Sequence, residues 1–526
     1  MNDPFFSFQM FIFLDNVPII VKTSTLSILF LKPYFQLMER KIERFKVNAI
    51  NDQEKLFKRL IKKGSITSFA KDHGLTSNAS YEDFKNKVPL NTYQDLLPYI
   101  ERIQKGEKDI LWPGLPLYLA TTSGTTSGEK YIPVTKDSLS RGMKSSVLCT
   151  ATYLKETKNF KPLFKKMVIL SANPKLKKDR KILYGKITGI FNRHIPSFMK
   201  KQRLPSVPTN SIEDWDEKMM KTVEESIGQD VGMVGGFPGW IIRYFERILE
   251  KTGHKTIGEA FPNLEIITHG GVAYGPYKER MKELIGRPFH RLEVFSATEG
   301  FFAFQDQQDK EDLLLVPNGE VFYEFIPLDQ WGQEEAERIS LKDVKVGVPY
   351  AMVISTLAGL WAFDLGDTVT FTSLSPFRLK VSGRTKHFIS NSGEHLISEQ
   401  VEEALAKACL EHDCRVNDFS VAPHIENKAG GNRHEWMIEF EKTPSDLRGF
   451  RDTLNQVLCQ LSDNYFLLID GSVLSPPLIS SIKQGGFVEY MKSINKMTHQ
   501  NKVPRLMNNR SLADAITPWK EVIYDS

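Results

Sequence analysis

Hydroxyl-bearing residues and glycines crowd one short stretch of this chain, "LATTSGTTSGEKYIPVT" (residues 119–135). Serine and threonine occupy every position of 121–127 except Gly124, and Gly128 and Lys130 follow. Glycines let backbone N–H groups approach an anion, hydroxyls add hydrogen-bond donors, and a lysine supplies positive charge. The stretch therefore predicts a loop that wraps phosphate groups.

The spacing of this loop differs from that of a P-loop, G-x-x-x-x-G-K-[ST]. Glu129 separates Gly128 from Lys130, and Tyr131 stands where a P-loop has the serine or threonine that holds magnesium. A polar surface turn is the plain alternative. It is disfavoured because the hydroxyls lie between an apolar strand pattern and the segment "YIP".

The segment "TSGTTSGEKYIPVT" resembles the first signature of the adenylate-forming enzymes. Its tail "KYIPVT" is similar to one branch, the acyl-acid amido synthetases first known as auxin-responsive proteins of plants, the Gretchen Hagen family, which also has bacterial members. Further resembling segments follow in the family's order: "EVFSATEGFFAFQ", "WAFDLGDTVTF", "VSGRTKHFISNSGEHLISEQVEEAL" and "HQNKVPRLMNNRSL". On this ordered resemblance, the chain is identified as a bacterial-type member of the family.

The resemblance implies an ATP site with magnesium. Lys130, Glu299 and Lys502 would be catalytic, and Glu299 would also be the magnesium ligand, because an ATP-bound magnesium ion takes one or two carboxylates and keeps several waters. The ATP-binding residues that the resemblance implies are Ser123, Gly124, Thr125, Thr126, Gly271, Phe295, Thr298, Asp367 and Arg384. Taken alone, Glu299 could be an ordinary loop carboxylate and Lys502 a solvated lysine.

Within this set, Phe295 would lie against the adenine and Thr298 would touch the α-phosphate. Asp367 would accept hydrogen bonds from both ribose hydroxyls, with Arg384 beside them. The family segment Tyr-Arg-x-Gly-Asp has an arginine that this chain lacks in residues 363–365. The departure puts one auxiliary contact in doubt and leaves the role of Asp367 unchanged.

Two further segments, "GMVGGFPGW" and "HGGVAYGPY", resemble family segments on the acyl side and the adenine side of the site. Val234, Phe237 and Trp240 would line the acyl pocket, although aromatic residues here could equally belong to the core. Thr385 and Lys386 would form the hinge to a smaller domain. A plain β-turn at "SGRTK" is the alternative for the hinge.

The segments that position these residues indicate α/β architecture, because strand-like and helical patterns alternate between about residues 90 and 380. "KKMVILSA" and "LEIITHGG" are strand-like, and "PGWIIRYFERILEKTG" and "NDQEKLFKRLIKKGS" are helical. After this region the helix "SEQVEEALAKACLEH" and the strand "HEWMIEFE" indicate a smaller α+β domain. We expect an N-terminal segment of uncertain order (1–45), a large ATP- and acyl-binding domain with β-sheets, flanking helices and a β-barrel-like subdomain (46–382), and a C-terminal lid domain (383–526).

Composition sets limits on partners. Of 526 residues, 41% are hydrophobic and 25% charged, and the net charge is +5, which is too mild to argue for nucleic acid. The basic run "KLKKDRK" (175–181) is typical of a solvated face. The apolar N-terminal residues are interrupted by polar ones and do not reach the roughly 20 apolar residues that a membrane helix needs. We expect no membrane partner, with a peripheral anchor as the minor alternative.

The four cysteines form no Cys-x-x-Cys pair and are too few for a disulfide scaffold. Cys409, His412 and Cys414 lack the spacing and the second ligand pair of a zinc site. A reducing, cytoplasmic setting fits this usage. A monomer is favoured, although the sequence does not set the oligomeric state.

The function implied by the resemblance is a ligase that forms carbon–nitrogen bonds. ATP would adenylate a carboxylic acid to acyl-AMP, and an amine, expected to be an amino acid, would then form an amide. One alternative is a coenzyme A or carrier-thiol ligase of the same superfamily, although "YIPVT" and "HEWMIEF" favour the amide branch. The other is a non-catalytic nucleotide-binding protein, against which the presence of Lys130, Glu299, Asp367 and Lys502 argues. The acid and the amine stay open.

Overall fold

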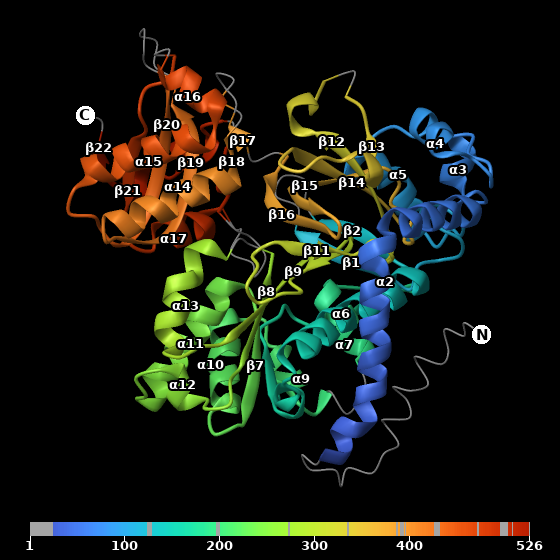
Figure 1. Ribbon diagram of the computed structural model, residues 1–526, viewed down its shortest axis with the longest axis horizontal. Helices are drawn as coiled ribbons and strands as arrows, with labels where there is room; N and C mark the ends of the chain where they lie inside the picture. The colour runs from blue at the N-terminus through green and yellow to red at the C-terminus, as the bar shows by residue number, and fades with distance from the viewer. Residues whose placement is uncertain are drawn as a thin grey trace.

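A computed structural model of the protein describes residues 25–123, 129–195, 200–271, 274–333, 336–385, 388–389, 394, 396–424, 432–470, 473–494, 503–507 and 509–524. Figure 1 shows a large body, coloured from blue to yellow-orange, with a smaller body in orange and red beside it. The two bodies have separate hydrophobic cores. This is the mixed α/β arrangement, with a large N-terminal and a smaller C-terminal domain, that the sequence predicts.

The large body is organised around one mixed sheet whose strands, in the described part of the chain, follow the order β13-β12-β14-β15-β16-β11-β10-β9-β8-β7-β3-β6. These strands are β3 (Lys166–Ile169), β6 (Arg203–Leu204), β7 (Val231–Gly236), β8 (Ile266–Gly270), β9 (His290–Ala297), β10 (Gly300–Phe304), β11 (Leu313–Leu315), β12 (Val321–Pro327), β13 (Ile339–Ser340), β14 (Pro349–Thr356), β15 (Phe363–Leu374) and β16 (Phe377–Arg384).

Strand β9 joins two halves of this sheet that differ in direction. From β9 through β8, β7 and β3 to β6 the strands pair in parallel, and from β9 to β13 they pair antiparallel. The strands that we expected in a barrel-like subdomain are thus continuous with the parallel strands. The described strands form an open sheet with β13 and β6 at its edges.

Helices cover the sheet on both sides because parallel strands are apolar on both faces. Helix α11 packs on β7, and α6 packs on β10 and on α2. In Figure 1 the green helices α10 to α13 lie on one side of β7 and β8. The helices of the large body are α2 (Thr25–Gly64), α3 (Ser68–Asp72), α4 (Tyr81–Lys87), α5 (Tyr93–Gln104), α6 (Lys136–Thr157), α7 (Ile187–His194), α9 (Val207–Asn210), α10 (Trp215–Ser226), α11 (Pro238–Thr252), α12 (Ile257–Ala260) and α13 (Lys278–Ile285).

A second sheet holds the hydroxyl-rich loop. Its strands, in order, are β2 (Glu129–Val134), β1 (Tyr118–Ser123), β5 (Ile182–Gly185) and β4 (Lys177–Asp179). Strands β1 and β2 pair antiparallel, with Thr122 opposite Lys130 and Ser123 opposite Glu129. The loop that connects this hairpin lies outside the described residues. In β4, residues 177–179 are exposed, which confirms the solvated face predicted for the basic run.

The N-terminal helix is longer than the sequence pattern indicates. The expected helix over "NDQEKLFKRLIKKGS" is the second half of α2, which begins at Thr25 and changes direction at Asn48, where the backbone is non-helical. Ile42 and Phe45 are buried in a cluster with Leu148 of α6. The helix therefore crosses the predicted boundary at residues 45–46, and that boundary stays a prediction.

The smaller body has its own sheet and helices. Its sheet runs in the order β19 (Arg415–His424), β20 (Arg433–Lys442), β21 (Leu478–Ile482) and β22 (Lys520–Tyr524), and a short hairpin of β17 (Phe388–Ile389) and β18 (Leu396–Ile397) leads into it. The helices are α14 (Ser398–Glu411), α15 (Leu447–Leu461), α16 (Asp463–Asp470), α17 (Gly486–Ser493) and α18 (Ser511–Ala515). Trp436 of β20 is fully buried in the core of this body. The strand predicted at "HEWMIEFE" is confirmed, but residues 434–440 are all buried, so the strand is covered on both faces and is not half-buried as predicted.

Most elements that the sequence predicts are confirmed within a few residues. They are β3 and β8 among the strands, and α11 and α14 among the helices. Among the described residues, every helix is too short or too polar to cross a membrane.

Candidate nucleotide and acyl site

Three neighbouring parallel strands of the large body end at one edge, and each is followed by a predicted site segment. Strand β7 leads to Phe237, β8 leads to Gly271, and β9 leads to Thr298 and Glu299. The strands are in register there, with Gly236 opposite His269 and Gly270 opposite Val294. Ligands of α/β sheets bind beyond the carboxyl ends of such strands. The fold therefore brings the predicted acyl, adenine and magnesium segments to a common edge.

Four predicted site residues from distant parts of the sequence gather at this edge. Asp367 and Arg384 are opposite each other on β15 and β16, with Nε of Arg384 3.1 Å from Oδ1 of Asp367. Lys130, Asp367 and Arg384 are all near enough to Glu299 to influence its ionisation. The ammonium of Lys130 also lies 5.3 Å from the centre of the Tyr93 ring. The cluster combines two carboxylates with two cations, as a site for a charged nucleotide requires.

Burial raises the pKa of the Glu299 carboxyl, and the nearby Asp367 carboxylate acts in the same direction. Arg384 and Lys130 oppose this rise. A divalent cation would favour the ionised form of both carboxyls, so the donor set fits magnesium. No group of three or more metal-ligating side chains exists among the described residues. This also fits, because magnesium is usually held by one or two carboxylates together with substrate phosphates.

The segment that lacks the family arginine has a different local structure. Oδ1 of Asp364 accepts a hydrogen bond of 2.8 Å from the backbone N–H of Gly366, next to Asp367. The carbonyl oxygen of Gly366 accepts a hydrogen bond of 2.9 Å from the backbone N–H of Thr385. Asp364 thus stabilises the turn that presents Asp367. The same turn is tied to Thr385, the predicted hinge residue, whose side chain is buried.

An aromatic group lies where the acyl pocket is predicted. The Phe237 and Trp240 rings meet edge to face, with centroids 4.6 Å apart. Trp215 packs on the other side of Trp240, at 4.5 Å. Gly271 adopts φ +75°, and a Cβ there would lie 2.4 Å from the Phe237 ring. The sequence therefore needs glycine after β8 so that Phe237 can pack against the backbone.

Two predicted binding residues lie in core positions. Val234 is fully buried in β7 within the cluster that includes Ile241. Phe295 is 7% exposed, and its ring centroid lies 5.0 Å from that of Phe302. Both side chains contribute to packing beneath the site, and their contact with a ligand stays a prediction.

Several predictions fall where the structure gives no description. Gly124, Thr125, Thr126, Lys386 and Lys502 lie outside the described residues. For Ser123 only the backbone is described, as the last residue of β1. Thr298 lies in the turn between β9 and β10, directly before Glu299.

Sequence reasoning missed a carboxyl group beneath this turn. Glu320 is 3% exposed, and its Oε1 accepts a hydrogen bond of 3.1 Å from the backbone N–H of Phe301, two residues after Glu299. Within the described part of the chain, its second oxygen has no hydrogen-bond partner. Burial raises the pKa of Glu320 to about 7, against the opposing charge of Arg141. A lone glutamate in "PNGEVF" gives no sequence signal of this position.

Three family models match in order: the GH3 family N-terminal domain at residues 38–223, the central domain at 313–384 and the C-terminal domain at 399–511. Together they cover most of the chain. The chain belongs to the GH3 family.

Relatives of this GH3 chain include plant amido synthetases. It is 22% identical over 552 residues to the indole-3-acetic acid-amido synthetase GH3.3 of Arabidopsis thaliana, covering 89% of this chain and 91% of the relative. It is also 22% identical over 559 residues to the jasmonoyl–L-amino acid synthetase JAR6 of Nicotiana attenuata, covering 90% and 94%. GH3 proteins of this kind are acyl acid amido synthetases, a family of ligases.

Solved structures share the fold of this GH3 chain. The AtGH3.15 acyl acid amido synthetase in complex with 2,4-DB aligns with a TM-score of 0.73 at 17% identity, covering 93% of this chain and 97% of that one. A 2-hydroxyisobutyryl-CoA ligase in the postadenylation state, in complex with 2-HIB-AMP, aligns with a TM-score of 0.58 at 12% identity, covering 89% of this chain and 90% of that one. The GH3 chain therefore shares its overall fold with both proteins.

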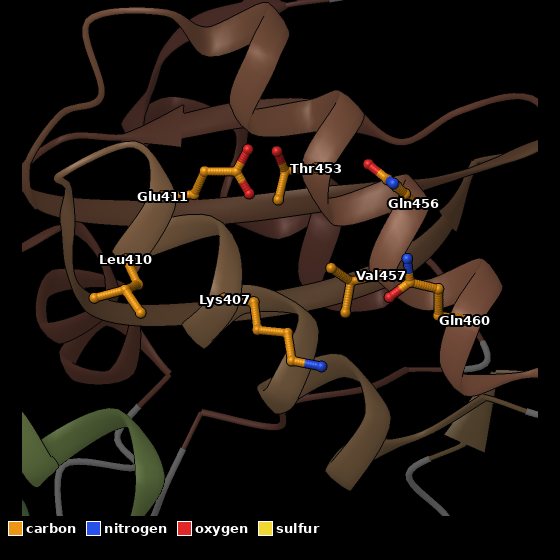
Figure 2. A pocket seen from close by; sticks show the side chains of 7 residues that line it. All are labelled: Lys407, Leu410, Glu411, Thr453, Gln456, Val457 and Gln460. Atoms are coloured by element: carbon orange, nitrogen blue, oxygen red, sulfur yellow. The ribbon is translucent and has the colours of Figure 1, made fainter.

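A surface groove of about 410 Å³ lies elsewhere, between α14 and α15 of the smaller domain. Figure 2 shows its lining, which is Lys407, Leu410, Glu411, Thr453, Gln456, Val457 and Gln460. These residues include none of the predicted site residues. The groove is therefore separate from the candidate nucleotide site.

Proposed function

We propose that this protein activates a carboxylic acid with ATP and transfers the acyl group to an amine, expected to be an amino acid, to form an amide. The observation that carries the proposal is the convergence of Lys130, Glu299, Asp367 and Arg384. Glu299 follows β9 at the same sheet edge where β7 leads to Phe237. Membership of the GH3 family supports it. We further infer a bacterial-type member, which rests on the sequence resemblance alone.

In the first half-reaction, a carboxylate oxygen attacks the α-phosphorus of ATP, and the bond between the α-phosphorus and the bridging oxygen breaks. Acyl-AMP forms and pyrophosphate leaves. This chemistry needs charge neutralisation and in-line geometry more than a covalent nucleophile. Lys130 supplies positive charge beside the phosphates, and Asp367 holds the ribose. Lys502 is the second proposed cation.

In the second half-reaction, the amine nitrogen attacks the acyl carbon, loses a proton to solvent or a base, and AMP leaves. Phe237 and Trp240 hold the apolar part of the acid, because their ring faces offer apolar surface at the end of β7. Glu299 would hold magnesium, which when bound neutralises charge on the ATP phosphates. Thr385 and Lys386 would be the hinge about which the smaller domain moves between the steps.

A thiol acceptor is the second candidate function. The structural likeness to a coenzyme A ligase favours it, since one fold serves both kinds of acceptor. A fold by itself does not fix the acceptor. The match to all three GH3 family models favours the amine.

The test is pyrophosphate release from ATP and magnesium. It is run with a panel of aryl, indolic and fatty acids, with and without pooled amino acids, and products are identified by mass spectrometry. We expect release that depends on one class of acid, and an N-acyl amino acid among the products. Thioester with coenzyme A and no amide would establish the thiol ligase. ATP binding without release for any acid would support the non-catalytic alternative.

A further inference from the structure

The turn that carries Glu299 rests on a buried carboxyl from a later part of the large domain. Glu320 directly precedes Val321, the first residue of β12. The backbone N–H of Phe301 donates a hydrogen bond of 3.1 Å to Oε1 of Glu320. A Cβ on Gly300 would lie 2.8 Å from Cγ2 of Val321 and 3.7 Å from the same Glu320 oxygen. The two residues that follow Glu299 therefore lie directly against the start of β12.

Helix α6 leaves space for this carboxyl and holds the chain before it. A Cβ on Gly142 of α6 would lie 3.0 Å from Oε1 of Glu320, so a larger side chain there would press on the carboxyl. The preceding residue, Arg141, donates hydrogen bonds of 2.9 and 3.0 Å to the carbonyls of Asn318 and Gly319. The helix thus fixes the approach to Glu320 without displacing its side chain.

Helix α2 holds the same segment from a different side. Gln53 of α2 is 3% exposed, and its Nε2 donates hydrogen bonds of 2.7 Å to the carbonyl of Pro317 and 3.0 Å to that of Val321. Its Oε1 accepts a hydrogen bond of 2.8 Å from the backbone N–H of Tyr323. Because this one buried side chain binds the backbone both before and after Glu320, the carboxyl of Glu320 has a fixed origin.

Glu320 is also linked to the end of the hydroxyl-rich segment. Thr135, the last residue of that segment, caps α6 and donates a hydrogen bond of 2.7 Å from its hydroxyl to the carbonyl of Leu357. The N–H of Leu357 donates a hydrogen bond of 3.0 Å to the carbonyl of Glu320. Together with the hydrogen bond from Phe301, these contacts connect the exit of the predicted phosphate loop to the turn after β9.

We propose that Glu320 is a positioning residue that holds the turn of Glu299, and thereby the Glu299 carboxylate, in the geometry needed to bind magnesium with ATP. The inference rests on the proposed function, in which Glu299 holds magnesium. The turn needs the acceptor oxygen of Glu320 at this place, because the Phe301 N–H donates to it. Without that acceptor the N–H loses its partner and the turn shifts to find another. Groups that orient a metal ligand affect metal affinity in this way.

Substitutions of Glu320 separate the acceptor from the other properties of the side chain. Glu320→Gln keeps an oxygen at the same reach. Glu320→Asp keeps the carboxyl but withdraws it by one methylene, and Glu320→Met fills the space without a strong acceptor. Glu324→Gln is the matched control, since Glu324 is a fully buried carboxyl on the same strand whose partners are Tyr81 and Arg338.

The first measurement is the magnesium concentration that gives half-maximal acid-dependent exchange of pyrophosphate with ATP, together with KM for the acid. In Glu320→Met and Glu320→Asp we expect the magnesium concentration to rise at least about tenfold. KM for the acid should change less than about twofold in these variants, because the acid binds through other elements. In Glu320→Gln and in Glu324→Gln both quantities should change less than about twofold.

The second measurement does not depend on activity. Amide hydrogen exchange of the full chain, without ATP or magnesium, is followed in a peptide that covers residues 298–302. Deuterium uptake there should be faster in Glu320→Met and Glu320→Asp than in the wild type, and unchanged in Glu320→Gln and Glu324→Gln. Both measurements are made below the unfolding midpoint of every variant. If Glu320→Met does not fold, Glu320→Asp carries the test.

The outcomes separate the positioning role from the proposed function. If the wild type exchanges pyrophosphate but the Glu320 variants match Glu324→Gln, the positioning role is wrong and the proposed function stands. Equal increases in the magnesium requirement and in KM for the acid would indicate general damage and would also overturn the role. If the wild type shows no exchange with any acid, the proposed function fails and this inference fails with it.

Discussion

Asp367 and Arg384 are cross-strand partners, with the carboxylate of one 3.1 Å from the guanidinium of the other. The Asp367 side chain is only 17% exposed, whereas that of Arg384 is 52% exposed. An ion pair with one partner in solvent adds little to stability. The arrangement fits the proposed ATP site better, because it combines a mostly buried carboxylate with a solvent-accessible cation.

Asp367→Asn should therefore impair the use of ATP while the fold is retained. Asp367→Asn would weaken two hydrogen bonds from the ribose to a charged acceptor, so its kcat/KM for ATP should fall about 100-fold. Arg384→Gln removes a contact that is exposed to solvent, so its kcat/KM for ATP should fall only about tenfold. Steady-state pyrophosphate release at saturating acid measures kcat/KM for ATP in both variants. Asp343→Asn, at an exposed carboxylate bonded to Ser340, is the control. Equal activity of the Asp367 and Asp343 variants would contradict the ribose role.

Gly271→Ala should weaken binding of the acid in addition to straining the backbone. Gly271 and Gly253 both have positive φ, at +75° and +73°, but only at Gly271 would a Cβ meet another residue, the Phe237 ring at 2.4 Å. The left-handed backbone costs about 1–2 kcal/mol for alanine at either site. We expect both variants to lose thermal stability, Gly271→Ala more because of the clash with Phe237, and KM for the acid to rise about tenfold only in Gly271→Ala. If the two variants have the same KM for the acid, Phe237 does not line the acyl pocket.

Removing divalent cations should stop adenylation. Excess EDTA should abolish pyrophosphate exchange, and added magnesium should restore it. Glu299→Gln should raise the magnesium concentration for half-maximal exchange at least about tenfold, because it replaces a carboxylate ligand. Glu311→Gln, at a surface carboxylate paired with Lys278, serves as the control. An unchanged magnesium requirement in Glu299→Gln would exclude this residue as the ligand.

Glu320 should make the stability of the protein depend on pH. Its pKa is raised by burial from 4.5 to about 7 in the folded protein. Between these values the folded state binds more protons than the unfolded state, so stability falls as pH rises through this range, by up to about 3 kcal/mol. Glu320→Gln cannot ionise and should lack this fall, while its amide oxygen can still accept from Phe301.

The measurement is the thermal unfolding midpoint of both proteins between about pH 5 and about pH 8. As the pH rises, the unfolding midpoint of Glu320→Gln should increase relative to that of the wild type. Parallel curves for the two proteins would show that Glu320 does not titrate in this range.

The secondary structure that positions the site could be predicted where local patterns were strong. Helix α11 follows from the apolar spacing after Pro238, and β8 from the apolar run that ends in glycines. The start of α2 at Thr25 was not predicted, because only the second half of the helix was recognised in the sequence. The order of the strands in the large sheet could not be predicted either, since pairing between distant segments leaves no pattern in the local sequence.

The sequence by itself predicted a phosphate-binding loop before Lys130, gave Glu299, Asp367 and Arg384 as candidates through the family resemblance, and indicated the division into a large and a small domain. These inferences depend on residue type and on the order of the segments along the chain, and both can be read without knowing any distance. Only the tertiary structure decided that Val234 and Phe295 pack in the core and that Glu320 lies under the Glu299 turn. Such contacts join residues far apart in the chain, and burial and proximity arise only when the sheets, helices and domains pack together.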